Sequence, residues 1–350
     1  MLKRLSHWLA LSFLSAVLVV GCGLGNSSDQ NSQSTAADCR VVQHDLGEAQ
    51  ICGQPQKIAV LNAYPLGLLL ALDQQPAGYA APLNVHQGEV FDNPVQQIPY
   101  LGERVTTQPI NLGASGEPAL ERLVAFKPDL IVTEGTSNYN LLSQIAPTIL
   151  WETRGFKGQW QQHLRSLAAA LGQGDKAETV IEQYETRVAE ARAEFAEVVA
   201  AHPKLLLLAA HRLDEGVFVL GADSYLDELL SGIGFELALQ PSDNIDINGP
   251  VSIEALPRFD DADSIIVLGY DLSGAQGQDS SADQSVNEQV EQQQRQTIQQ
   301  DWEASGIAQS LAASQAGRVY FATFYKWMGL SGPIGAELVL EQLSQFLLGE

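Results

Sequence analysis

Basic residues are scarce in this chain of 350 residues, which has 19 Lys and Arg against 42 Asp and Glu. Such an acidic excess argues against a broad nucleic-acid-binding face. Long apolar stretches are missing too, because the run from Leu9 to Val20 is too short to cross a bilayer as a mature helix. Since 45% of the residues are hydrophobic, the chain can nevertheless bury one large core or two ordinary ones. At this length we expect two domains.

Motifs of several enzyme classes are also missing. The chain has no Walker loop and no dinucleotide-binding glycine loop. The segment Gly113-Ala-Ser115-Gly-Glu117 comes close to a nucleophile elbow, but Glu117 stands where a second glycine is required. The histidines share neither a helical face nor the spacing of zinc or manganese ligands: His44, His86, His163, His202 and His211. We expect no enzyme and no resident metal, with a lipid-anchored hydrolase as the alternative.

The N-terminus has the features of an export signal. Lys3 and Arg4 precede the apolar run, and Val19-Val20-Gly21-Cys22 resembles the bacterial lipobox. We expect residues 1–21 to be removed and Cys22 to carry lipid, although a plain secretory signal with a chance cysteine would look similar. Residues 22–38 are rich in Ser, Gln, Asn and Asp, which is typical of a flexible tether. The mature protein is then expected in the periplasm, attached to a membrane through its lipid only.

Cys39 and Cys52 flank two short strand-like runs around an Asp45-Leu-Gly turn. They are equidistant from the centre of the turn, so a hairpin would bring them face to face. An oxidising compartment permits a disulfide. We therefore predict a bond between Cys39 and Cys52.

Strand and helix patterns alternate in two stretches, residues 39–157 and 204–350, which favours two α/β lobes with parallel sheets covered on both faces. Strands are expected at Lys57–Asn62, Leu130–Thr133, Thr148–Trp151, Lys204–Ala210, Ser264–Gly269 and Arg318–Ala322. Helices are expected at Leu66–Leu72, Leu141–Ala146, Gln159–Leu171, Asp223–Ser231 and Ala336–Leu347. Glu121 and Glu254 occupy matching places, since each begins a helix that leads through an acidic turn into a buried strand.

A helical connector, residues 158–203, joins the two stretches. Its longest helix is expected from Asp175 to Ala201, because the apolar residues of this segment follow one another at steps of three and four. Asp175 and Glu178 have the spacing of a capping box, and Pro203 marks the end. At about 1.5 Å per residue such a helix spans roughly 40 Å, enough to brace two domains.

Residues 273–300 are low in apolar residues and rich in Gln, Ser and Asp. We interpret this segment as a solvated insertion in the second lobe, with some helix in its later part. A surface adhesin or scaffold that uses this Gln-rich insertion is a further alternative.

Several segments together resemble the periplasmic binding proteins of iron-siderophore and vitamin B12 ABC importers. They are the lipobox, Glu-Arg-Leu-Val-Ala-Phe-Lys-Pro-Asp-Leu-Ile-Val from Glu121, the long connector helix, Ser-Ile-Glu-Ala-Leu from Ser252 and Gly-Arg-Val-Tyr from Gly317. The resemblance implies two doubly wound α/β lobes joined by one long rigid helix, with a ligand cleft between the lobes. It also implies a monomer that docks on an ABC permease dimer, with its ATPase, through a glutamate on each lobe, here Glu121 and Glu254.

For the ligand, the resemblance leaves a ferric siderophore, ferric citrate, haem or cobalamin open. Ferric siderophores and ferric citrate are bulky and usually anionic, so their cleft needs cationic groups for charge and aromatic groups for flat contact. Such residues follow the strands, where doubly wound sheets bind ligands: Tyr64, Arg104, Trp151, Arg154, His211, Arg212, Tyr325, Lys326 and Trp327. This mixture favours a ferric siderophore or ferric citrate over cobalamin, and it implies no cofactor beyond the bound iron(III) chelate.

Overall fold

The computed structural model describes residues 39–81, 92–135, 138–152, 155–238, 249–270 and 285–349. The predicted signal peptide, tether and lipidated Cys22 lie outside these ranges, and so does Arg154. Residues 38–350 form one unit by their contacts. In the ranges that the structure describes, none of the helices combines the length and the apolar character needed to cross a membrane.

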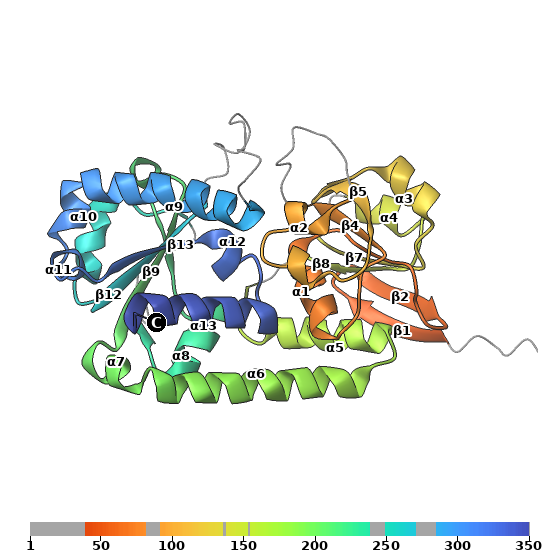
Figure 1. Cartoon of the computed structure of the whole chain (residues 1–350), viewed down its shortest axis with the longest axis horizontal. Helices are drawn as coiled ribbons and strands as arrows, with labels where there is room; N and C mark the ends of the chain where they lie inside the picture. Colours follow the sequence, from red (N-terminus) through yellow and green to blue (C-terminus); the bar gives the residue numbers. More distant parts are fainter. Residues whose placement is uncertain are drawn as a thin grey trace, which may run out of the picture. The chain divides into compact units, whose positions relative to one another are not determined.

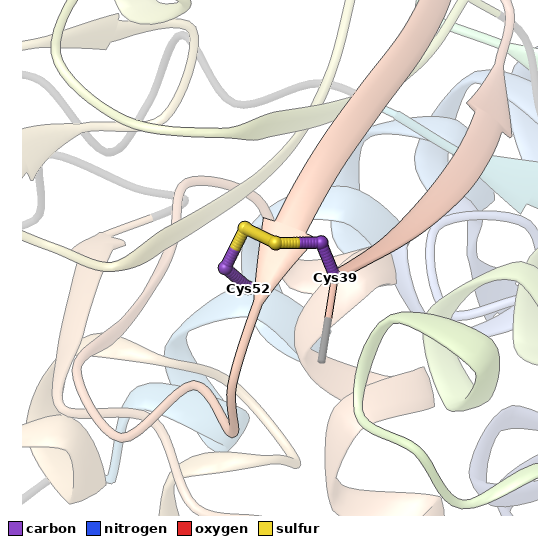
Figure 2. The surroundings of a disulfide bond; sticks show 2 residues. All are labelled: Cys39 and Cys52. Atoms are coloured by element: carbon purple, nitrogen blue, oxygen red, sulfur yellow. A yellow bond between two sulfur atoms is a disulfide. The ribbon is translucent and has the colours of Figure 1, made fainter. Parts of the chain in front are cut away.

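An antiparallel hairpin precedes the first sheet. Its strands are β1 (Cys39–His44) and β2 (Gly47–Cys52), with Cys39 directly opposite Cys52. The two cysteines form a disulfide with their Cα atoms 4.0 Å apart (Figure 2). Val42 and Ile51 turn inward from the hairpin and are buried in the core. The hairpin packs against helix α5 (Gln159–Ala170) and strand β8 (Thr148–Trp151).

The first lobe is built on a six-stranded sheet of order β6-β5-β4-β3-β7-β8, parallel except for β6. Its remaining strands are β3 (Ile58–Val60), β4 (Gly78–Ala81), β5 (Ile110–Ala114), β6 (Glu117–Pro118) and β7 (Leu130–Glu134). Its helices are α1 (Ala63–Ala71), α2 (Pro94–Gln97), η1 (Gly102–Arg104), α3 (Leu120–Phe126) and α4 (Tyr139–Leu142). The parallel order confirms the expected α/β class.

The second lobe repeats this plan with the path β10-β9-β12-β13, and β11 pairs with β9. Its strands are β9 (Lys204–Ala210), β10 (Phe218–Leu220), β11 (Glu236–Leu237), β12 (Ser264–Gly269) and β13 (Val319–Thr323). Its helices are η2 (Leu213–Glu215), α8 (Tyr225–Ile233), η3 (Ile253–Phe259), α9 (Val286–Ala304), α10 (Gly306–Ser310), α11 (Ala312–Gln315), α12 (Phe324–Trp327) and α13 (Pro333–Leu347). The parallel β11-β9-β12-β13 path corresponds to β4-β3-β7-β8 in the first lobe.

Alternate residues of the central strands face opposite sides of each sheet. One side of both sheets contributes to a single core cluster, for instance through Val60 in the first lobe and Leu207 in the second. The same cluster also includes residues of α1, α5, α8 and α13. The other sides have separate cores, with Ile131 in the first lobe and Val267 in the second. The two lobes are therefore joined by a shared helical layer as well as by the chain.

The connector contains α6 (Gly174–Glu194) and α7 (Ala196–Ala201), which correspond to the long helix expected from the sequence. Helix α6 packs against α5, α8 and α13 (Figure 1). The helix is interrupted at Phe195, whose side chain is fully buried with its ring 6.3 Å from that of Phe235. The expected capping box is absent because the helix begins at Gly174 and the carboxylate of Glu178 binds Arg165 of α5 at 2.7 Å and 2.9 Å.

The later part of the predicted insertion, from residue 285, is helical as expected, whereas residues 273–284 lie outside the described ranges. Its later part forms most of α9, which begins at a capping box of Ser285 and Glu288 and continues beyond residue 300. Val290 and Ile298 of this helix are buried in the second lobe. A Cβ on Gly269, the last residue of β12, would lie 1.7 Å from the carbonyl oxygen of Gln294, so α9 packs directly on the strand. A few apolar residues on one face are enough to dock a polar helix.

Candidate functional site

The carboxyl ends of parallel strands are where doubly wound folds bind ligands. In the first lobe this edge is polar. Asn62, just after β3, accepts hydrogen bonds from Thr133 Oγ1 at 2.9 Å and from the backbone N–H of Glu134 at 3.0 Å. Its Nδ2 donates to Ser115 Oγ at 2.9 Å. Ser115 lies in the turn between the antiparallel strands β5 and β6, so the near-elbow motif is a hairpin turn and lacks the strand-to-helix geometry of a nucleophile elbow.

In the second lobe the same edge is aromatic. His211, Tyr270 and Phe324 directly follow β9, β12 and β13. The ring of Tyr270 lies 5.9 Å from the rings of both His211 and Phe324, and 6.4 Å from that of Phe218 on β10. None of the four is fully buried, and Phe218 is 36% exposed. We call His211, Phe218, Tyr270 and Phe324 the aromatic surface, and it is suited to flat contact with a ligand.

The cations beside the aromatic surface are paired with carboxylates. Arg212 donates to both oxygens of Asp301, at 2.7 Å and 3.2 Å, and this bond raises the pKa of its guanidinium. His211 Nδ1 lies 2.8 Å from a carboxylate oxygen of Glu215. Both predicted residues thus lie at the expected sheet edge, each with an acidic neighbour.

A cluster of side chains connects the two lobes at this edge. The hydroxyl of Tyr100, between α2 and η1, donates to Glu291 Oε1 of α9 at 2.8 Å. The same carboxylate lies 2.5 Å from Lys326 Nζ and 3.3 Å from Arg295 Nη1. Lys326 Nζ also lies 4.8 Å from the centre of the Tyr100 ring. The centres of the Tyr100 and Tyr325 rings are 6.1 Å apart. We call Tyr100, Glu291, Arg295, Tyr325 and Lys326 the junction cluster.

The pair of Lys326 and Glu291 in the junction cluster is largely shielded from solvent, which strengthens its charge interaction, whereas the Arg295 side chain is 40% exposed. The side chains of Lys326 and Glu291 are only 12% and 20% exposed. Burial alone would raise the pKa of Glu291, but the Lys326 ammonium, the Tyr100 hydroxyl and Arg295 outweigh it and hold the pKa below its usual value. Burial and the charge of Glu291 raise the pKa of Tyr100. Glu291 is therefore ionised and Tyr100 is neutral at physiological pH.

Three of the predicted ligand residues lie in the core. Tyr64 and Trp151 are each 1% exposed and Trp327 is 0% exposed. The hydroxyl of Tyr64 lies 2.7 Å from His163 Nδ1, and the Trp151 ring stacks on His163 at 4.5 Å. Trp327 Nε1 donates to Gln342 Oε1 of α13 at 2.7 Å. These aromatic side chains turn from the strand ends into the shared helical layer, so their predicted contact with a ligand is not supported by this geometry.

Arg104 also lies apart from the strand ends. Its guanidinium is 3.0 Å from the carboxylate of Glu337 on α13. It lines a hollow of about 210 Å³ whose walls include residues of α1, α6 and α13. Arg104 therefore faces the helical layer, away from the aromatic surface.

Glu121 and Glu254 are both exposed and lie in the first turn of α3 and η3. These helices precede β7 and β12, which hold equivalent places in the two sheets. Neither carboxylate forms an ion pair with another residue in the described ranges. The two glutamates are thus exposed at matching positions of the two lobes.

Six residues of the aromatic surface and the junction cluster were not predicted from the sequence: Tyr100, Phe218, Tyr270, Glu291, Arg295 and Phe324. Tyr270 and Phe324 directly follow strands, so the rule that selected His211 would have found them. Tyr100 and Glu291 have no such signal, because the hydrogen bond between them joins residues 191 positions apart.

Comparisons with known proteins agree with this architecture. The sequence model of a family described as periplasmic binding protein matches residues 58–325. A probable siderophore-binding lipoprotein of Bacillus subtilis, YfiY, is 24% identical over 347 residues, or 96% of this chain and 96% of that protein. The Fe(3+)-citrate-binding protein YfmC of the same organism is 25% identical over 338 residues, covering 94% of this chain and 93% of its own length.

Among solved structures, Staphylococcus aureus SirA complexed with staphyloferrin B superimposes with a TM-score of 0.66 at 23% identity, covering 88% of this chain and 98% of that one. The catecholate-siderophore binding protein VctP from Vibrio cholerae gives a TM-score of 0.63 at 18% identity, covering 89% and 100% of the two chains. These likenesses show the same two-lobed fold.

Proposed function

This chain belongs to the periplasmic binding protein family, and from that membership and the geometry of its site we propose that it captures a ferric siderophore or ferric citrate for an ABC importer. The observation that carries the proposal is the aromatic surface at the carboxyl edge of the second sheet, opposite a polar edge in the first lobe. The names of the relatives support the ligand class, since YfiY is described as siderophore-binding and YfmC as citrate-binding.

The proposed ligand site combines the aromatic surface with cations at the strand ends. Of the residues predicted from the sequence, the proposal retains Arg154, His211, Arg212, Tyr325 and Lys326. It adds Phe218, Tyr270 and Phe324. It leaves out Tyr64, Trp151 and Trp327, because they are buried, and Arg104, because it faces α13.

Delivery of the ligand requires a second surface. In the proposal, Glu121 and Glu254 bind basic residues on the two halves of a permease dimer, which works with its ATPase. Their exposure and their equivalent places on two lobes suit a bivalent contact with a symmetric partner. The helical layer shared by the lobes would keep the two carboxylates at a nearly constant separation.

The proposal places the protein outside the cytoplasmic membrane as a monomer. A signal peptide of residues 1–21 would be removed, Cys22 would carry lipid, and residues 22–38 would act as the tether. The disulfide between Cys39 and Cys52 fits an oxidising compartment. Capture and release without chemical conversion of the ligand complete the proposed role.

Iron uptake by whole cells tests the proposal. In the host that carries the gene, we would delete it and measure uptake of radiolabelled iron supplied as ferric siderophores or as ferric citrate. We expect uptake from at least one chelate to fall on deletion and to return with the wild-type gene. It should not return with the double variant Tyr270→Ala plus Phe324→Ala. Thermal unfolding of the purified double variant serves as the control that it is folded. Uptake that never depends on the gene would refute the role.

A further inference from the structure

In the junction cluster, the carboxylate of Glu291 forms ion pairs with two cations. Glu291 Oε1 lies 2.5 Å from Lys326 Nζ, and Glu291 Oε2 lies 3.3 Å from Arg295 Nη1. Tyr100 adds a hydrogen bond from the other lobe. Lys326 belongs to the proposed site and Arg295 lies beside it, but each already has a counter-ion.

Arg212 and the His211 ring at this sheet edge also have acidic neighbours. Arg212 faces Asp301, with Asp214 3.8 Å away, and His211 faces Glu215. The sequence adds little positive charge, since the internal segments outside the described ranges contain no Lys and a single Arg, which is Arg154. The whole chain has a formal charge of −23, which repels anions at long range.

A polyanionic chelate would therefore meet a large penalty. To bind Lys326 or Arg295 it would have to lie beside Glu291 or compete with it for these cations, and that carboxylate is only 20% exposed. A shielded carboxylate that loses its partners costs free energy, and it would also repel the incoming ligand. An uncharged or cationic chelate leaves these pairs intact and packs its apolar groups on the aromatic surface.

We propose that Glu291 sets the charge selectivity of the cleft by neutralising Lys326 and Arg295, so that the protein prefers uncharged or cationic ferric chelates to polyanionic ones. Ferric trihydroxamates belong to the preferred class, whereas ferric tris-catecholates and ferric citrate belong to the disfavoured class. This inference rests on the proposed function and narrows its ligand.

The test compares dissociation constants for three probes, namely an uncharged ferric trihydroxamate, a trianionic ferric tris-catecholate and ferric citrate. Binding of each to the mature protein is followed by quenching of intrinsic fluorescence. The readout is the ratio of the tris-catecholate constant to the trihydroxamate constant. A purely structural effect of a mutation changes both constants together and leaves this ratio unchanged.

Wild-type protein is expected to bind the trihydroxamate most tightly. Glu291→Gln leaves both cations without their counter-ion, so it should lower the ratio of the tris-catecholate constant to the trihydroxamate constant by about tenfold or more. Lys326→Gln should shift it in the opposite direction. The matched control is Glu303→Gln, which makes the same charge change on an exposed residue near the other end of α9 and should leave the ratio near the wild-type value.

Two results would overturn the inference alone. One is a wild-type preference for the tris-catecholate or ferric citrate. The other is an equal loss of affinity for all three probes in Glu291→Gln, which would mean that the carboxylate only ties the lobes together. If the wild-type protein bound none of the probes, and no other ferric chelate either, the proposed function would fail and this inference with it.

Discussion

The amino ends of the two sheets are built alike, whereas their carboxyl ends differ. At the amino end of the first sheet, Asp129 accepts hydrogen bonds from the backbone N–H groups of Gln56 and Lys57, both at 2.9 Å. At that of the second, Asp263 accepts one from Lys204 N–H at 2.9 Å. In both places the backbone N–H of the aspartate also donates a hydrogen bond to the carbonyl oxygen of the lysine.

The carboxyl ends show no such match. Asn62 organises a polar network in the first lobe, while Tyr270 is the centre of an aromatic surface in the second. The difference suggests a division of labour within each lobe. The repeated α/β plan places Glu121 and Glu254 equivalently, which suits the proposed docking on a symmetric partner. The strand ends, which differ, would supply the two walls of the proposed ligand site.

The largest expected effect concerns the matched glutamates. Glu121→Arg combined with Glu254→Arg should abolish iron uptake, because two like charges would face each other across the permease contact. The affinity for the chelate should stay unchanged, since neither residue is part of the ligand site. Uptake in cells and binding in vitro are measured on the same variant. Normal transport would show that the symmetry of the two lobes has no role in docking.

A buried histidine of the connector packs against the first lobe, where it contacts Tyr64 and Trp151. Burial lowers the pKa of His163 to about 4 from its ordinary 6.5. The unfolded chain therefore binds a proton first on acidification, and stability that is complete above pH 6.5 is lost as the pH falls toward 4. His163 alone should cost about 2 kcal/mol between pH 7 and pH 5.

Denaturant unfolding at the two pH values measures this loss. His163→Gln can still bond to the Tyr64 hydroxyl but does not titrate, so its loss should be smaller than that of the wild type by about 2 kcal/mol. Hydrogen exchange should locate the acid-sensitive region in α1 of the first lobe and α5 of the connector. Equal pH dependence in the two proteins would contradict the assignment.

Because the amino ends of the two sheets are built alike, we expect mutations there to lower stability by similar amounts, with smaller effects than those above. Asp129→Ala and Asp263→Ala each remove acceptors from backbone groups at the start of β3 or β9, and each should lower the free energy of unfolding by about 1–2 kcal/mol. Asn at either position keeps one acceptor oxygen and should cost less. A single unfolding transition is expected because the lobes share a core. A large loss at one position and none at the other would show that these ends are alike in geometry only.

The sequence predicted those elements of the fold that have strong local patterns. Thr148–Trp151, Lys204–Ala210 and Ser264–Gly269 were predicted with the bounds they have, because each is a continuous apolar run between turn residues. Helix α4 was expected at Leu141–Ala146 but is Tyr139–Leu142. The break at Phe195 was not predicted, since burial against Phe235 depends on a distant part of the chain.

The site was harder to predict than the fold. Strand ends could be located from the sequence, so His211 and Lys326 were placed at the correct sheet edge. The direction of a side chain at a strand end depends on tertiary packing, and this is why Trp151 was assigned to the ligand although it stacks on His163 in the core. The contact of Tyr100 with Glu291 joins two lobes and has no local pattern.

The most direct test of the account is a fluorescence titration of the mature protein with ferric chelates. We predict saturable quenching by a ferric siderophore or ferric citrate, and an affinity weaker by roughly tenfold or more in Tyr270→Ala plus Phe324→Ala. The same chelator without iron serves as the control for the ligand. Saturable binding that is unaffected by loss of both rings would contradict the claim that the aromatic surface of the second lobe holds the ligand.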